Sequence, residues 1–183
     1  MSPDLNTLTR WCLQANAAAY EFCGVSNTCI QTSMALVEFL RLQGLEAEPF
    51  RARVIVHPTR EYEEHVLGRP GVGSFGGEGH RSQHGGWCGH LAVSCGQYVL
   101  DPTLDQFEAE GLAPTPTVFF KPKDWDVPPA DRPWQGGAWH RWQEGNLDIG
   151  HARHPRQVGW KSKPAARPSA WADVVEIMIE MDR

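Results

Sequence analysis

The amino-acid sequence predicts an α+β domain in which two helices precede a set of antiparallel strands. Apolar residues recur at three- and four-residue steps over residues 5–22 and again over about 28–43, which is the period of amphipathic helices. Residues 89–101 carry two short apolar runs around Gly96-Gln97, which is typical of a β-hairpin with a tight turn. With 183 residues, 41% of them hydrophobic, the chain is expected to form one domain with a substantial core.

The elements between and after these landmarks follow from local patterns. Gly44 is expected to end the second helix, because glycine adopts the left-handed conformation of a helix C-cap at little cost. The alternation of Ala52, Val54 and Val56 predicts a strand over residues 51–57. Further elements are expected as helical turns within 59–67, a short helix over 104–110, a strand over 115–120, edge strands over 139–145 and 157–161, and a C-terminal helix after Pro168 with Ser169 as its N-cap.

Two stretches are expected to be loops because of their glycine and proline content. Residues 68–89 hold so many glycines that no regular element is expected there. Residues 121–137 are rich in proline and are expected to wrap over the body of the domain. His151 and His154 are assigned to a solvated loop further on.

Charge and cysteine content limit the partners that the protein can have. A net charge of −5 and an isoelectric point near 5.9 provide no basic surface for nucleic acid or for anionic membranes. No stretch reaches the ~18 apolar residues that a membrane span requires, and no signal peptide is recognised. We therefore expect a cytoplasmic protein without nucleic-acid or membrane partners. Its five cysteines, an odd number, argue against a disulfide framework.

Cys29 is the cysteine in the most reactive setting. It lies at the start of the second predicted helix, where unpaired backbone N–H groups and the helix dipole favour a thiolate over a thiol, whose pKa is ordinarily about 8.5. The same N–H groups can hold an oxyanion. Cys12 and Cys23 belong to the first helix, and Cys95 falls on the apolar face of the hairpin, where cysteine behaves as a small hydrophobe.

The hairpin brings a histidine and an aspartate together by its register. If Gly96-Gln97 is a two-residue loop, paired residues have numbers that sum to 193, so Ala92 opposes Asp101. Alternation along the strand places His90 on the face of Ala92, as a diagonal neighbour of Asp101 roughly 7 Å away at the backbone. Thiolate attack by Cys29, proton transfer by His90 and orientation of the imidazole by Asp101 would then form a catalytic triad.

These residues carry a resemblance to a known family. A cysteine that opens the helix in NTCIQTSMALVEFLRLQGLEAEPF, followed by a strand and then by GHLAVSCGQYVLDPT, resembles the transglutaminase-like branch of the papain-like cysteine enzymes. The resemblance covers residues 26–105, the expected catalytic core, and leaves 106–183 as a C-terminal wrap and helix of the same domain, 1–183. It implies a papain-like, transglutaminase-like fold, with the nucleophile helix packed on an antiparallel sheet.

The resemblance also implies the activity and leaves several points open. A cysteine-dependent hydrolase or acyltransferase (a peptidase, amidase or deamidase) would act on a peptide, protein or small amide and would need no cofactor. The backbone N–H of Cys29 would contribute to the oxyanion hole, with Asn27 or Gln14 as a further donor. Ile30 and Leu91-Ala92 stand where family members often have aromatic residues. Arylamine N-acetyltransferase activity ranks lower, because the Arg-Gly-Gly context around the cysteine is missing.

Two other interpretations compete with the enzyme. The first is a catalytically silent papain-like binding protein. The second is a zinc-dependent hydrolase that uses His80, His84, Cys88 and His90, a cluster whose spacing is unlike that of structural zinc sites. A simpler hypothesis for the same glycine-rich loop makes it a flap over the substrate groove, with Trp87 and His84 lining that groove.

Overall fold

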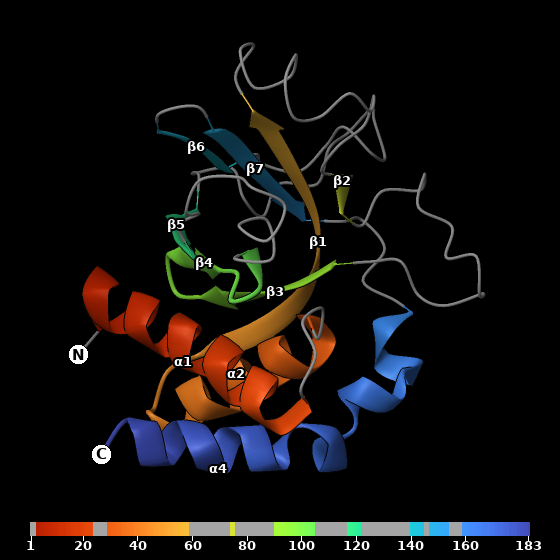
Figure 1. Ribbon diagram of the computed structural model, residues 1–183. Coiled ribbons are helices and arrows are strands. Elements are labelled where there is room, and N and C mark those ends of the chain that lie inside the picture. The colour runs from red at the N-terminus through yellow and green to blue at the C-terminus, as the bar shows by residue number, and fades with distance from the viewer. Residues whose placement is uncertain are drawn as a thin grey trace. The chain divides into compact units, whose positions relative to one another are not determined.

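The computed structural model describes residues 3–23, 29–58, 74–75, 90–104, 117–121, 140–144, 147–153 and 159–183 (Figure 1). These residues fall into two compact units. The first takes in the described parts of 1–50, 91–120 and 158–183, and the second takes in those of 51–90 and 121–157. The expectation of a single domain over 1–183 stays a prediction.

Three α-helices of the first unit pack against one another. They are α1 (Leu5–Cys23), α2 (Cys29–Leu42) and α4 (Ala172–Met181), and each contacts the other two (Figure 1). The ring of Trp11 meets that of Phe39 edge to face, with 5.5 Å between the ring centroids, and so joins α1 to α2. Both helices predicted from the N-terminal periodicity are confirmed.

The ends of the first two helices follow capping chemistry. The Asp4 side chain accepts a hydrogen bond of 2.7 Å from the backbone N–H of Thr7, which makes Asp4 the N-cap of α1. At the end of α2, Gly44 has a φ of 77°, its N–H donates to Arg41, and the N–H of Leu45 donates to Leu40. These two bonds form a Schellman motif, so the predicted role of Gly44 is confirmed.

The first unit also holds a small sheet. Its strands are β4 (Tyr98–Leu100), β5 (Val118–Phe120), β3 (His90–Cys95) from Leu91 onward and β1 (Ala47–Pro58) as far as Phe50, in the order β5–β4–β3–β1. His90 and residues 51–58 of β1 belong to the second unit. The pairs β3–β4 and β4–β5 are antiparallel. The α+β class is therefore confirmed, and so are the predicted hairpin and the strand that ends at residue 120.

The helices cover one face of this sheet with a dense apolar core. Because residues alternate along a strand, Val93 and Cys95 of β3 share a face with their partners Leu100 and Tyr98 of β4. This face packs on all three helices. The fully buried members of the core are Leu8, Cys12, Ala15, Ala18, Ala19, Ala35, Leu36, Val37, Phe39, Leu40, Val93, Leu100, Val174 and Met178.

The second unit consists of antiparallel strands in its described part. Strand β1 continues here, beyond Phe50, and pairs with β7 (Leu147–Arg153) in a register that sets Val54 opposite His151. Strand β7 pairs in turn with β6 (His140–Glu144), as predicted for an edge strand over 139–145. The two residues Ser74–Phe75, β2, pair with β1.

Four sequence-based expectations are wrong. Ser74–Phe75 forms a strand within the glycine-rich stretch that was expected to hold no regular element. His151 lies in β7 rather than in a loop. Residues 160–162 form a 3-10 helix instead of an edge strand. Ser169 lies inside another 3-10 helix, Pro168–Ala170, and Trp171 is the N-cap of α4 without a side-chain hydrogen bond.

Several expected elements lie outside the described residues, namely the helical turns within 59–67, most of the short helix over 104–110 and most of the loop over 121–137. Among the residues that the structure does describe, no helix is both long and apolar enough to cross a membrane.

Candidate active site

Cys29 is the first residue of α2, where the sequence placed it. Cys29 is half-buried, and its thiol is not part of a disulfide. A residue in this position is surrounded by the N–H groups of the first helical turn, which have no partners within the helix. Such groups, with the positive end of the helix dipole, stabilise a thiolate and can bind an oxyanion.

The register of the β3–β4 hairpin agrees with the one deduced from the sequence. The residue pairs are Val93–Leu100, Ser94–Val99 and Cys95–Tyr98, each with numbers that sum to 193. Gly96, at φ 52°, opens the two-residue turn that fixes this register. Continuing the same register sets Asp101 opposite Ala92, and alternation sets His90 on the face of Ala92.

His90 and Asp101 are both withdrawn from solvent. His90 is the first residue of β3 and is 2% exposed, and Asp101 follows β4 directly and is fully buried. The N–H of Asp101 donates to the carbonyl oxygen of Thr117 at 2.8 Å, which extends the β4–β5 ladder by one residue. Burial of a carboxylate is costly unless it is hydrogen-bonded or faces a positive charge, so the surroundings of Asp101 bear on its role.

The carboxylate of Asp101 accepts two contacts from Thr103. Both the backbone N–H and the hydroxyl of Thr103 approach Oδ1 of Asp101, each at 3.4 Å. A contact from an aspartate to the N–H two residues onward is an Asx turn, and the intervening Pro102 fits it because proline has no N–H to compete. The sequence Asp-Pro-Thr was the signal that could have identified this turn.

A hydrogen bond between Ser33 and Leu91 attaches α2 to the start of β3. The Ser33 hydroxyl donates to the carbonyl oxygen of Leu91 at 2.8 Å, and both side chains are fully buried. Ser33 lies one turn after Cys29 on the same helix face, and Leu91 is the next residue after His90. Ser33 was not singled out from the sequence, because its partner is 58 residues away.

Pro102 explains why the Leu91 carbonyl accepts a hydrogen bond from a side chain instead of from the neighbouring strand. Residue pairs in an antiparallel ladder alternate between hydrogen-bonded and non-hydrogen-bonded pairs. Beside a two-residue turn the pair Cys95–Tyr98 is hydrogen-bonded, and so is the pair Val93–Leu100. The next hydrogen-bonded pair would be Leu91 with Pro102. Proline has no N–H to donate. The hydroxyl of Ser33 therefore takes the place of the missing N–H at the point where β4 ends.

Cys12 and Cys95 are buried thiols of the core. Burial raises the pKa of the Cys12 thiol, and the negative charge of Asp101 raises it further. Cys12 therefore stays protonated, and its sulfur lies 3.9 Å from the carbonyl oxygen of Thr117, the same atom that accepts from Asp101. The prediction that Cys95 acts as a small hydrophobe is consistent with its place in the core.

Only some of the side chains expected around the triad, as oxyanion donors, groove residues or metal ligands, lie within the described residues. Gln14 donates from Nε2 to the carbonyl oxygen of Met181 at 3.1 Å, which attaches its side chain to the end of α4; its suggested role as an oxyanion donor stays a prediction. Asn27 and the groove residues His84 and Trp87 lie outside the described residues, as do His80 and Cys88. Within the described part, no three His, Cys, Asp or Glu residues gather closely enough to hold a metal ion.

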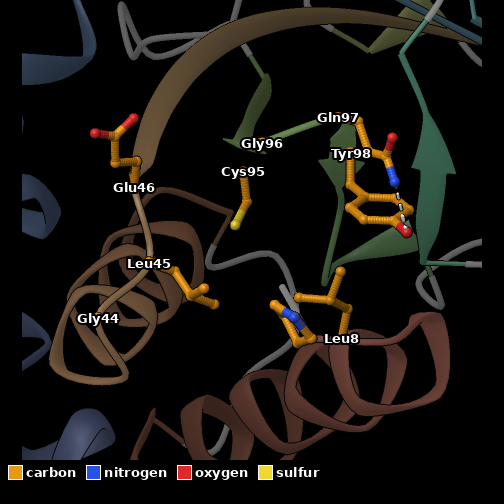
Figure 2. A pocket seen from close by; sticks show the side chains of 9 residues that line it. Leu8, Gly44, Leu45, Glu46, Cys95, Gly96, Gln97 and Tyr98 are labelled. Atoms are coloured by element: carbon orange, nitrogen blue, oxygen red, sulfur yellow. Dashed lines mark hydrogen bonds between the residues drawn. The ribbon is translucent and has the colours of Figure 1, made fainter. Parts of the chain in front are cut away.

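A pocket of about 460 Å³ lies at the other end of α2 and of the hairpin (Figure 2). It is lined by residues that follow α2 and by the hairpin turn, and the Cys95 sulfur and the Leu8 and Leu45 side chains point into it. Since α2 has 14 residues, it is about 21 Å long, and Cys29 is at its opposite end. This pocket is therefore separate from the candidate active site.

No protein-family model, no curated protein and no solved structure matches the chain.

Proposed function

We propose that the protein is a cysteine-dependent enzyme of transglutaminase-like, papain-like type, with Cys29, His90 and Asp101 as its triad. The observation that carries the proposal is the hydrogen bond from Ser33 to the carbonyl of Leu91. It supports a meeting of the helix that begins with the nucleophile and the strand that begins with the histidine. Cys29 precedes Ser33 by about 6 Å along the helix axis, on the same face, toward the end from which the thiolate would act.

The proposed chemistry is acyl transfer through a thioester. The Cys29 sulfur would attack the carbonyl carbon of an amide, and the developing negative charge on the oxygen would be held by backbone N–H groups at the start of α2. His90 would give a proton to the departing amine, which leaves the acyl group on sulfur. His90 would then remove a proton from water or from an acceptor amine, whose attack releases the acyl group and restores the thiol.

The role of Asp101 in this proposal is to hold His90 in one tautomer and to stabilise its cationic form. Its complete burial supports that role, since a buried carboxylate acts strongly on a nearby imidazolium in a medium of low dielectric constant. Peptides, proteins or small amides are the proposed substrates. Water as the acceptor would give a peptidase, amidase or deamidase, and an amine would give a transferase.

Labelling with electrophilic acyl-thiol probes tests this function. We expect a panel of such probes to modify the wild-type protein at Cys29, as located by peptide mass spectrometry, and Cys29→Ala to abolish the labelling. Cys12→Ala is the matched control, because it removes a thiol from the core and should leave labelling unchanged. Probes that modify the Cys29→Ala variant as fast as the wild type, or that leave Cys29 untouched, would exclude the enzyme and favour a silent binding protein.

A further inference from the structure

We propose that Thr103 is a positioning residue for the triad, whose hydroxyl fixes the orientation of the Asp101 carboxylate toward His90. This inference rests on the proposed function and adds a fourth residue to its machinery. Thr103 would not touch the substrate. It would act through Asp101, by contacting Oδ1 of the carboxylate and so holding its orientation.

The geometry around Asp101 supports this role. A buried side chain of this kind can rotate about its last bond, so the position of its oxygens depends on which donors they meet. The N–H and the hydroxyl of Thr103 both point to Oδ1, and the N–H of Asp101 itself is taken by Thr117. Thr103 is 3% exposed, so water does not compete freely for its hydroxyl. The contacts thus favour one orientation of the Asp101 carboxylate.

The distances indicate the size of the effect. At 3.4 Å each, the Thr103 contacts are longer than the usual hydrogen bond, and they resemble the loose contacts that often tighten only when substrate binds. Loss of the hydroxyl alone would leave the N–H contact in place. We therefore expect a partial loss of function in a Thr103→Val variant, by roughly fivefold, as for one modest hydrogen bond.

Thr117 provides a matched control for this variant. The Thr117 carbonyl accepts the hydrogen bond from the Asp101 N–H. The Thr117 hydroxyl is buried too, but among the described residues this hydroxyl has no hydrogen-bond partner. Thr117→Val therefore removes a buried hydroxyl from a residue bonded to the Asp101 backbone without removing a contact to the Asp101 carboxylate. Thr103→Ser keeps the hydroxyl and should restore the wild-type behaviour.

The test is the pH dependence of Cys29 alkylation by iodoacetamide in the full-length protein. A carboxylate that is less well oriented stabilises the imidazolium less, which disfavours the thiolate–imidazolium pair at acidic pH. For Thr103→Val we expect alkylation near pH 6 to be roughly fivefold slower than in the wild type. Thr117→Val and Thr103→Ser should follow the wild-type profile.

A double-mutant cycle with Asp101→Asn separates positioning from a structural role. If Thr103 acts through Asp101, Thr103→Val has no further effect on the alkylation profile in the Asp101→Asn background. Equal effects in both backgrounds would overturn the proposal, as would a wild-type profile for Thr103→Val alone. If Thr103→Val does not fold, Thr103→Ala carries the same comparison. Wild-type alkylation that does not depend on His90 would instead refute the proposed function itself.

Discussion

Ser33 and Ser162 each donate a hydroxyl hydrogen bond to a backbone carbonyl, but only Ser33 does so in the core. Ser33 reaches Leu91 at 2.8 Å, and Ser162, which is exposed, reaches Gly159 at 3.0 Å. Water can replace the second bond, whereas the first serves a carbonyl that Pro102 cannot satisfy. Substitution of the two serines therefore compares the contribution of a buried hydrogen bond to stability with that of an exposed one.

Ser33→Ala is expected to lower the free energy of unfolding by about 1–3 kcal/mol, because it leaves the Leu91 carbonyl buried and unpaired. Ser162→Ala should change it by less than about 0.5 kcal/mol. Urea denaturation of the two variants measures both values. Equal losses in the two variants would show that the Ser33 bond does not hold α2 on β3.

Asp4 gives a pH-dependent contribution to stability. The hydrogen bonds from Thr7 lower the pKa of Asp4 below its ordinary value of 3.8. A carboxyl group with a lowered pKa in the folded state stabilises that state above the unfolded pKa, and the stabilisation is lost as the pH falls through the folded value. Asp4→Asn keeps a capping side chain without the titration. The difference in unfolding free energy between wild type and Asp4→Asn should therefore shrink as the pH falls below about 4.

At the level of residues, the sequence predicts local relations well and distant ones poorly. A two-residue turn pairs Cys95 with Tyr98, and this pair fixes the register of the whole hairpin, so the register could be deduced from the sequence. The Asx turn from Asp101 to Thr103 spans two residues and was within reach of the same reasoning. The bond from Ser33 to Leu91 depends on how α2 packs on β3, and no local pattern encodes it.

The elements of the first unit begin and end where local chemistry requires. The Schellman motif at the end of α2 depends on Gly44, whose φ of 77° is costly for any residue with a Cβ. No neighbouring atom lies within 4 Å of the position that a Cβ would take, so a substitution there meets only the backbone cost.

Gly44→Ala is therefore expected to reduce the free energy of unfolding by about 1 kcal/mol, through backbone strain alone. Gly44→Asn should cost less, because asparagine tolerates the left-handed conformation better than alanine does. Urea denaturation of the pair tests this order. An alanine variant as stable as the wild type would mean that α2 ends without the left-handed residue.

The element predictions failed where pairing rather than local preference decides the structure. Strand β7 contains Asp148 and Gly150, which disfavour strands, yet it pairs with both β1 and β6. Ser74–Phe75 becomes a strand by pairing with β1. Periodicity sufficed for α1 and α2, whose apolar faces are repeated over several turns.

At the scale of the whole chain, side chains of the N-terminal helix α1 bind the residues at the end of the C-terminal helix α4. Oδ1 of Asp182, the residue after α4, accepts from Arg10 Nη1 at 2.6 Å and from Trp11 Nε1 at 2.9 Å. Gln14 reaches the neighbouring Met181 carbonyl. These contacts fix the end of α4 on the first helix, over the core that α2 shares.

Asp182→Ala is expected to cost about 1 kcal/mol of unfolding free energy, mostly through the half-buried bond to Trp11. Asp182→Asn keeps an oxygen that can accept from Trp11 and loses only the charge opposite Arg10, so its cost should stay below about 0.5 kcal/mol, since exposed ion pairs contribute little. Thermal or urea unfolding compares the two. A larger loss of unfolding free energy in Asp182→Asn than in Asp182→Ala would contradict the assignment of most of the stabilisation to the Trp11 hydrogen bond.

If Cys29 and His90 act together as proposed, the rate of Cys29 alkylation at mildly acidic pH depends on His90. Near pH 6 an ordinary thiol is well under about 1% ionised. We predict that iodoacetamide modifies Cys29 at least about tenfold faster than it modifies Cys12 or Cys95, and that His90→Ala removes this advantage. Uniformly slow modification of all three thiols in the folded wild-type protein would show that Cys29 is not an activated nucleophile.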